Sequence, residues 1–145
     1  MSRASFRILL AIGTALLPGS VSSIAEPLQT GVVPPAVTLT GERGGLVKGG
    51  EWSSDEIRGK IYAFYYIDPD HRTRNDPLYA ALKTAGFSPE HTGSIAVINM
   101  AATWIPGFLV DAGLKKKQEE FPGTLFVKDN EKVLVEQWGL DDNNS

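Results

Sequence analysis

One histidine with two nearby carboxylates is the clearest set of residues for acid–base chemistry. Asp68, Asp70 and His71 lie within four positions of one another. A carboxylate that orients an imidazole can make it a general base, and the same side chains could coordinate a metal ion. The alternative is an ordinary solvated loop. The other histidine, His91, lies twenty positions further on in a different loop, so we predict no metal site.

Two arginines follow the histidine and precede a predicted helix. Arg72 and Arg74 lie just before Pro77, a residue type that favours the first position of a helix. Guanidinium groups and the free backbone N–H groups of a helix N-terminus could together hold an anion. The alternative is that Asp76 caps this helix and the arginines pair with Asp68 and Asp70 on the surface.

A second candidate segment is Trp104-Ile105-Pro106, which follows a predicted buried strand. Ligands of α/β proteins commonly bind beyond the carboxyl ends of the strands, so this segment could line a groove beside the loop that starts at Asp68. The alternative is that these residues only pack against the core. The predicted binding residues are His71, Arg72, Arg74, Trp104, Ile105 and Pro106.

Several function classes are excluded by composition. The 145 residues contain no cysteine, which rules out thiol–disulfide oxidoreductase activity, cysteine-ligated zinc and iron–sulfur clusters. Aspartate and glutamate number 17 against 14 lysines and arginines, a balance that argues against nucleic-acid binding. The chain also lacks a phosphate-binding Gly-rich motif and a nucleophile elbow, and we predict no cofactor.

Alternating strands and helices must position these residues. Residues 61–67 and 94–100 are continuous apolar runs typical of strands buried on both faces, and we place the first in the middle of a sheet. Between them, Leu78, Ala81, Leu82 and Ala85 form one apolar stripe of a helix that ends at Gly86. A second helix is predicted over 108–120 and a third strand over 124–127. This order predicts parallel crossovers and the α/β class.

The two ends of this region are less regular. Residues 26–36 are rich in proline and predict an extended lead-in, followed by a hairpin-like opening over 37–46. Ser53 or Ser54 is expected to cap a short helix that reaches Ile57. Residues 133–138 fit either a returning strand or a short helix.

Residues 1–25 have the pattern of a cleaved signal peptide. Arg3 and Arg7 precede an apolar stretch, and small residues occupy the positions before a predicted cleavage after Ala25. The apolar stretch is about half of the roughly 20 residues that span a bilayer, so we expect no stable membrane anchor after cleavage. The predicted location is the periplasm.

The order of several short motifs resembles a known family. Trp52, Gly59-Lys60, the strand ending at Ile67, Ile105-Pro106-Gly107 and the run Phe126-Val127-Lys128-Asp129 together are similar to the YtfJ-like family of exported bacterial thioredoxin-like proteins. The resemblance implies a thioredoxin-like domain over 37–145, with a mixed central sheet flanked by helices. The redox Cys-x-x-Cys motif of thioredoxin-like enzymes is absent here.

The resemblance also implies an early stop. Phe121 to Leu140 resembles the segment before the terminal β-hairpin of longer members, so we expect the terminal hairpin and helix to be missing. In the alternative, Thr124 to Trp138 forms that hairpin and only the last helix is missing. In both cases a sheet face or edge would lack its cover.

Three functions follow from these observations. The first is a non-redox binding or accessory protein of the cell envelope, whose partner is a protein, peptide or small ligand. The second is an envelope enzyme that uses His71 with Asp68 or Asp70. The third is the transcriptional regulator that the family label implies, which we disfavour because an exported acidic domain lacks both access to DNA and the charge to bind it.

Overall fold

A four-stranded mixed sheet lies at the centre of the computed structural model, which describes residues 27–140. The strands are β1 Thr38–Leu39, β2 Gly44–Leu46, β3 Trp52–Ser53, β4 Ile61–Ile67, β5 Thr92–Asn99 and β6 Thr124–Asp129. The α-helices are α1 Asp76–Ala85, α2 Gly107–Glu120 and α3 Val133–Trp138, and the 3-10 helices are Gly41–Arg43, Ser54–Glu56 and Pro69–His71. The predicted α/β class is confirmed, and the arrangement is consistent with a thioredoxin-like fold.

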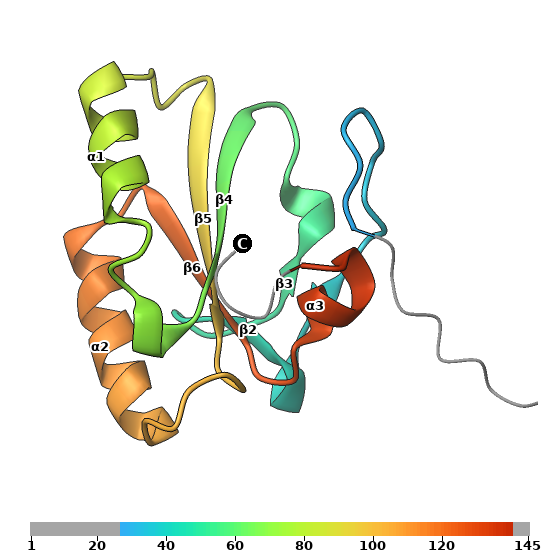
Figure 1. The fold of residues 1–145 in the computed structure, drawn as a ribbon, viewed down its shortest axis with the longest axis vertical. Coiled ribbons are helices and arrows are strands. Elements are labelled where there is room, and N and C mark those ends of the chain that lie inside the picture. Colours follow the sequence, from blue (N-terminus) through green and yellow to red (C-terminus); the bar gives the residue numbers. More distant parts are fainter. Residues whose placement is uncertain (1–26, 141–145) are drawn as a thin grey trace, which may run out of the picture.

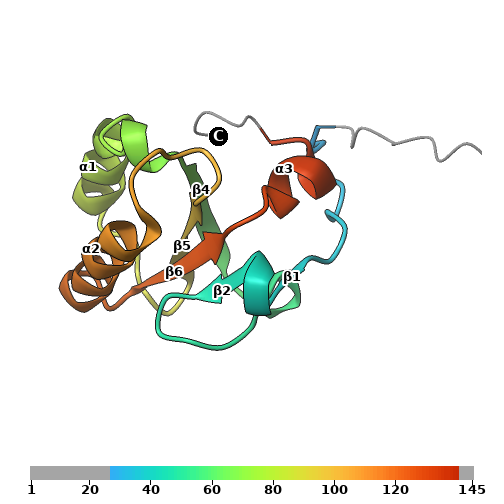
Figure 2. The same ribbon diagram turned by 90° about the horizontal axis from the view of Figure 1, so that it is seen from below.

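The central sheet has the order β2-β6-β5-β4 and separates two layers. β4, β5 and β6 are parallel, and β2 is antiparallel to β6. Helices α1 and α2 cover one face, whereas α3 and the small β1-β3 sheet lie on the other (Figures 1 and 2). The parallel strands therefore all end at the same edge of the sheet, where their following loops meet.

Successive residues of β4 contribute to different sides of the core. Phe64 packs against Trp138 of α3 with ring centroids 5.4 Å apart, and Tyr65 stacks on Tyr79 of α1 at 4.4 Å. This alternation is the two-residue period of a strand. Burial raises the pKa of Tyr65, and it raises the pKa of Tyr79 to about 12, with smaller contributions from Tyr65 and Asp76.

The placement of β4 corrects one prediction. We expected residues 61–67 in the middle of the sheet. Within residues 27–140, however, β4 pairs only with β5 and is the outermost strand of the sheet. The apolar sequence indicates that both faces of the strand are covered, and in the structure α1 covers one face and α3, through Trp138, covers the other. Covered faces do not determine how many neighbouring strands are present, so the sequence pattern misled us.

The predicted hairpin over 37–46 is also wrong. β1 pairs with β3, while β2 pairs with β6 in the other sheet, so the two opening strands are not partners. Gly44, at the start of β2, has φ 128°, and a Cβ there would meet the Lys128 carbonyl oxygen. Only glycine therefore fits at the point where the chain passes from one sheet to the other. The predicted short helix after Ser53 is present as the 3-10 turn Ser54–Glu56, in which the Ser53 hydroxyl accepts from the Asp55 N–H at 3.3 Å.

The helices confirm their predicted ranges more closely than their packing faces. α1 ends at Gly86, which has the left-handed conformation expected of a helix cap. Of the predicted stripe, Leu82 packs against the core, whereas Leu78 is half exposed and Tyr79, which lies outside the stripe, contacts the core as well. Residues 133–138 form the helix α3, so the alternative of a terminal hairpin over 124–138 is wrong.

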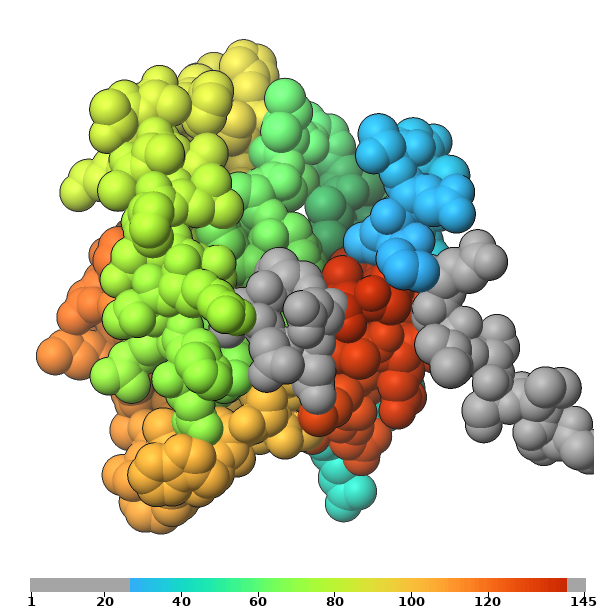
Figure 3. Space-filling model, viewed as in Figure 1, coloured from blue at the N-terminus to red at the C-terminus, as the bar shows by residue number. Residues whose placement is uncertain are grey.

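Some predictions lie outside the described residues. They concern the signal peptide, its cleavage after Ala25, and the residues after Leu140. Residues 27–36 contain no helix or strand, and they lie against α3, where Trp138 Nε1 donates to the Pro35 carbonyl at 2.8 Å (Figure 3). None of the helices found between residues 27 and 140 has the length and apolar character needed to cross a membrane.

Candidate functional site

The candidate site lies where β4 and β5 end. Asp68 directly follows β4, and the loop after β5 carries Thr103 and Trp104 before α2 begins at Gly107. Because β4 and β5 are parallel, their carboxyl ends bring these loops to one edge, as the sequence predicted. Both loops lie at the lower edge of the sheet in Figure 1.

Asp68 orients His71 through a 3-10 turn. The Asp68 side chain is buried, and its Oδ2 lies 2.7 Å from His71 Nδ1, while its Oδ1 accepts from the Asp70 N–H at 2.8 Å. The His71 side chain is 60% exposed. Of the two tautomers of an imidazole, a carboxylate at Nδ1 favours the one that carries its proton there, in which Nε2 is an acceptor. The predicted Asp–His pair is therefore present, with Asp68 as the partner.

Thr103 joins the two loops. Its hydroxyl donates to Asp70 Oδ1 at 2.6 Å and accepts from the Ile105 N–H at 3.0 Å. The second bond is that of an ST turn, in which a hydroxyl binds the backbone two residues ahead. Trp104 lies between the two ends of this turn and is 84% exposed. The prediction that Trp104 only packs against the core is thus wrong in this structure.

The remaining predicted residues differ in exposure. Arg72 and Arg74 are exposed, Ile105 is partly buried, and Pro106 is exposed as the N-cap of α2. Asp76 does not precede the helix as a cap but is its first residue, with Asn75 before it. Phe108 and Leu109, in the first turn of α2, are also exposed.

The second histidine is far from this edge. The His91 carbonyl accepts from the N–H of Ile61, the first residue of β4, which places His91 at the opposite end of the sheet from His71. Among residues 27–140 no group of three or more His, Asp or Glu side chains is arranged to hold a metal ion. The two histidines therefore do not contribute to one site.

Sequence reasoning missed Thr103 and Asp129. Asp129 is fully buried at the end of β6, where its carboxylate accepts from the Tyr66 hydroxyl at 3.1 Å and from the N–H groups of Val133 and Leu134 at 2.9 Å. This carboxylate caps α3 and belongs to the support of the fold. The N-cap position of α3 is Lys132, and Asp129 lies four positions before Val133, so the spacing of an ordinary N-cap gave no signal for it.

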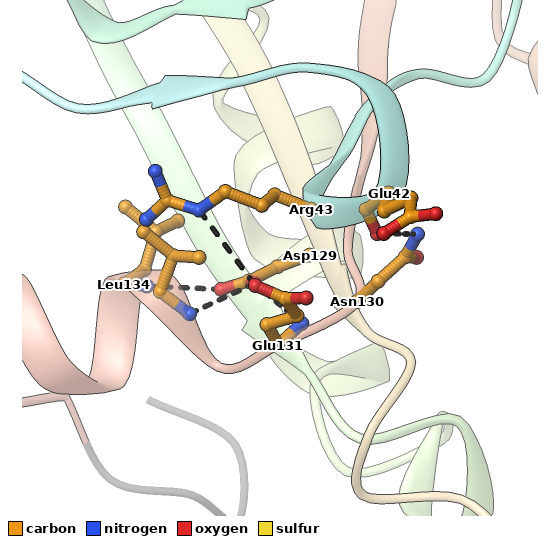
Figure 4. Close-up of polar contacts among 7 residues, drawn as sticks. Glu42, Arg43, Asp129, Asn130, Glu131 and Leu134 are labelled. Atoms are coloured by element: carbon orange, nitrogen blue, oxygen red, sulfur yellow. Dashed lines mark hydrogen bonds and ion pairs between the residues drawn. The ribbon is translucent and has the colours of Figure 1, made fainter.

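Contacts of Asn130 and Glu131, which connect β6 to α3, hold this connection against the start of the domain (Figure 4). Asn130 Nδ2 donates to the Glu42 carbonyl at 2.8 Å, and Arg43 lies 3.8 Å from Glu131. The Asn130 N–H also donates to the Arg43 carbonyl. These bonds hold the 3-10 helix Gly41–Arg43 against the connection between β6 and α3.

The fold and this edge define an α/β domain with an Asp–His pair and an exposed tryptophan beyond the ends of parallel strands. Residues 42–145 match the family described as bacterial protein of unknown function (YtfJ_HI0045), and the chain belongs to this family. The predicted resemblance is thereby confirmed.

Two relatives match most of the chain. The uncharacterized protein YtfJ of Escherichia coli K12 is 26% identical over 151 residues, covering 97% of this chain and 80% of its own length. An uncharacterized protein of Haemophilus influenzae is 26% identical over 135 residues, covering 87% of this chain and 73% of its own length.

Proposed function

We propose that this protein is an exported, periplasmic, thioredoxin-like binding protein of the cell envelope that performs no thiol redox chemistry. The observation that carries the proposal is the Thr103–Asp70 hydrogen bond of 2.6 Å, which holds a largely exposed tryptophan beside the His71 loop. An exposed indole costs hydration free energy, and tryptophan is enriched where proteins bind partners. The absence of cysteine excludes disulfide exchange.

Binding at this edge is tested by two-dimensional NMR of the purified protein titrated with a library of small peptides and aromatic fragments. We expect saturable shifts of the Trp104 indole signal, and no shifts in a Trp104→Ala variant. Trp52 and Trp138 are buried, so their indole signals report on folding in the same spectrum. A library that shifts no signal of Trp104, His71 or their neighbours would refute binding at this edge.

Export is supported by the signal-peptide pattern of residues 1–25. Expressed in a bacterium with two membranes, the chain is expected in the periplasmic fraction with a mass that corresponds to a start at Glu26. The variant Ala25→Leu changes the residue next to the cleavage point and should accumulate as precursor. The control Ile24→Leu alters a position that the peptidase tolerates and should be processed normally. Unprocessed wild-type protein in the cytoplasm would contradict the proposal.

A second candidate function is an envelope enzyme that uses His71 as a general base. The observation that favours it is the 2.7 Å contact between Asp68 Oδ2 and His71 Nδ1, which leaves Nε2 free to accept a proton. Turnover of the bound compound separates the two candidates. A binding protein does not turn over the compound, and its Trp104 site stays saturable in the His71→Ala variant. An enzyme turns the compound over, and in this variant it keeps substrate binding and loses turnover.

A further inference from the structure

The loop that carries Trp104 is hydrogen-bonded to a carboxylate, that of Asp70. Asp70 Oδ1 accepts from Thr103, the residue directly before Trp104, and the Thr103 hydroxyl also holds the Ile105 N–H. Asp70 itself is exposed. Thr103 therefore joins the exposed Asp70 carboxylate to the loop that carries the exposed Trp104.

The neighbouring imidazole adds an acceptor to this surface. Asp68 occupies Nδ1 of His71, so that Nε2 is the ring nitrogen left for a ligand, and it can accept a hydrogen bond. A carboxylate and a ring nitrogen acceptor both favour a ligand that donates hydrogen bonds or carries positive charge. An indole face attracts cations through its quadrupole, and tryptophan is the best of the aromatic side chains in this respect.

We propose that Trp104 and Asp70 form a binding site for an organic cation, either a primary amine or a quaternary ammonium group. The proposal rests on the proposed binding function of this edge and names its ligand class. The cation lies on the indole and is paired with the Asp70 carboxylate, while Phe108 and Leu109, both exposed nearby, contact the apolar part of the ligand. Arg72, two positions after Asp70, would instead favour an anion, and the test includes that outcome.

The test compares three probes of nearly equal shape. Choline carries a quaternary ammonium group, 3,3-dimethyl-1-butanol is its neutral counterpart, and 3,3-dimethylbutanoate is a related anion. Each is titrated into the purified protein while the indole N–H signal of Trp104 is followed by NMR. We expect choline to saturate this signal with a dissociation constant at least about fivefold lower than that of the neutral alcohol, because only choline gains the cation–π and carboxylate attraction.

Two variants assign the attraction to its residues. Asp70→Asn keeps an oxygen acceptor for Thr103 but removes the charge, and it should weaken choline binding about fivefold without altering the indole signals of Trp52 and Trp138. Trp104→Phe keeps an aromatic face that attracts cations less strongly, and it should also weaken choline binding. Because this variant lacks the Trp104 indole signal, its binding is followed through the NMR signals of His71. The control Glu90→Gln removes an exposed carboxylate next to His91, at the opposite end of the sheet, and should leave choline binding unchanged.

The remaining outcomes separate this inference from the proposed function. If the alcohol binds as tightly as choline, or if the anion binds and Arg72→Gln abolishes its binding, the cation site is refuted while binding at this edge stands. If none of the probes shifts Trp104 but fragments of the library do, the cation site alone is refuted. If neither the probes nor the library cause shifts, both proposals fail.

Discussion

Replacement of Asp129 by alanine is expected to lower the free energy of unfolding by about 3–5 kcal/mol. The carboxylate is fully buried and accepts four hydrogen bonds, from the Tyr66 hydroxyl and from the N–H groups of Glu131, Val133 and Leu134. Alanine removes this acceptor and the cap of α3, and each unsatisfied buried donor costs about 1–3 kcal/mol. Chemical denaturation followed by circular dichroism measures the loss.

Two controls separate the hydrogen bonds from the general effect of substitution. Asp129→Asn preserves the shape and one acceptor oxygen and should cost less than the alanine variant. Asp111→Ala removes a carboxylate that is 41% exposed and pairs with Lys128, so it should cost about 1 kcal/mol or less. If Asp129→Ala is no more destabilising than Asp111→Ala, then the cap of α3 does not support the fold as we describe.

Replacement of Gly44 by alanine is expected to disrupt the pairing of β2 with β6 and to lower the free energy of unfolding by about 3 kcal/mol or more. Gly44 has φ 128° and ψ −146°, a region that residues with a Cβ hardly occupy. An alanine Cβ would also collide with the Lys128 carbonyl oxygen. Denaturation gives the stability, and hydrogen exchange of the β6 amides reports the pairing.

Gly41→Ala is the matched control for this second variant. Gly41 also has a positive φ of 58°, but a Cβ there meets no atom within 4 Å. It should therefore cost only about 1 kcal/mol of backbone strain. Equal losses for the two variants would show that the close approach of β2 to Lys128 adds nothing beyond the unusual backbone angle.

The general position of the candidate site could be predicted because it depends on local signals. The apolar runs of β4 and β5 and the intervening helix imply a parallel crossover, and parallel strands deliver their following loops to one edge. For this reason the loops of His71 and Trp104 could be expected together. The pairing of His71 with a nearby aspartate was also predictable, because the two residues are only three positions apart.

The contacts that define the site in detail are not local. Thr103 and Asp70 are 33 positions apart, and no periodicity shows that one hydroxyl joins their loops. Whether Trp104 is buried or exposed likewise depends on what packs around it. Tryptophan occurs in both environments, so its residue type alone left packing and binding as open alternatives.

The amino-acid sequence by itself determined the α/β class and the ranges of the main strands and helices. These follow from hydrophobic periodicity and helix-ending glycines, which act over a few residues. Only the tertiary structure decided that β4 is an edge strand, that β1 and β2 join different sheets, and that Asp129 caps α3. Strand neighbours and buried hydrogen bonds depend on residues that are distant along the chain, and the free energy of packing selects among pairings that the local sequence permits equally.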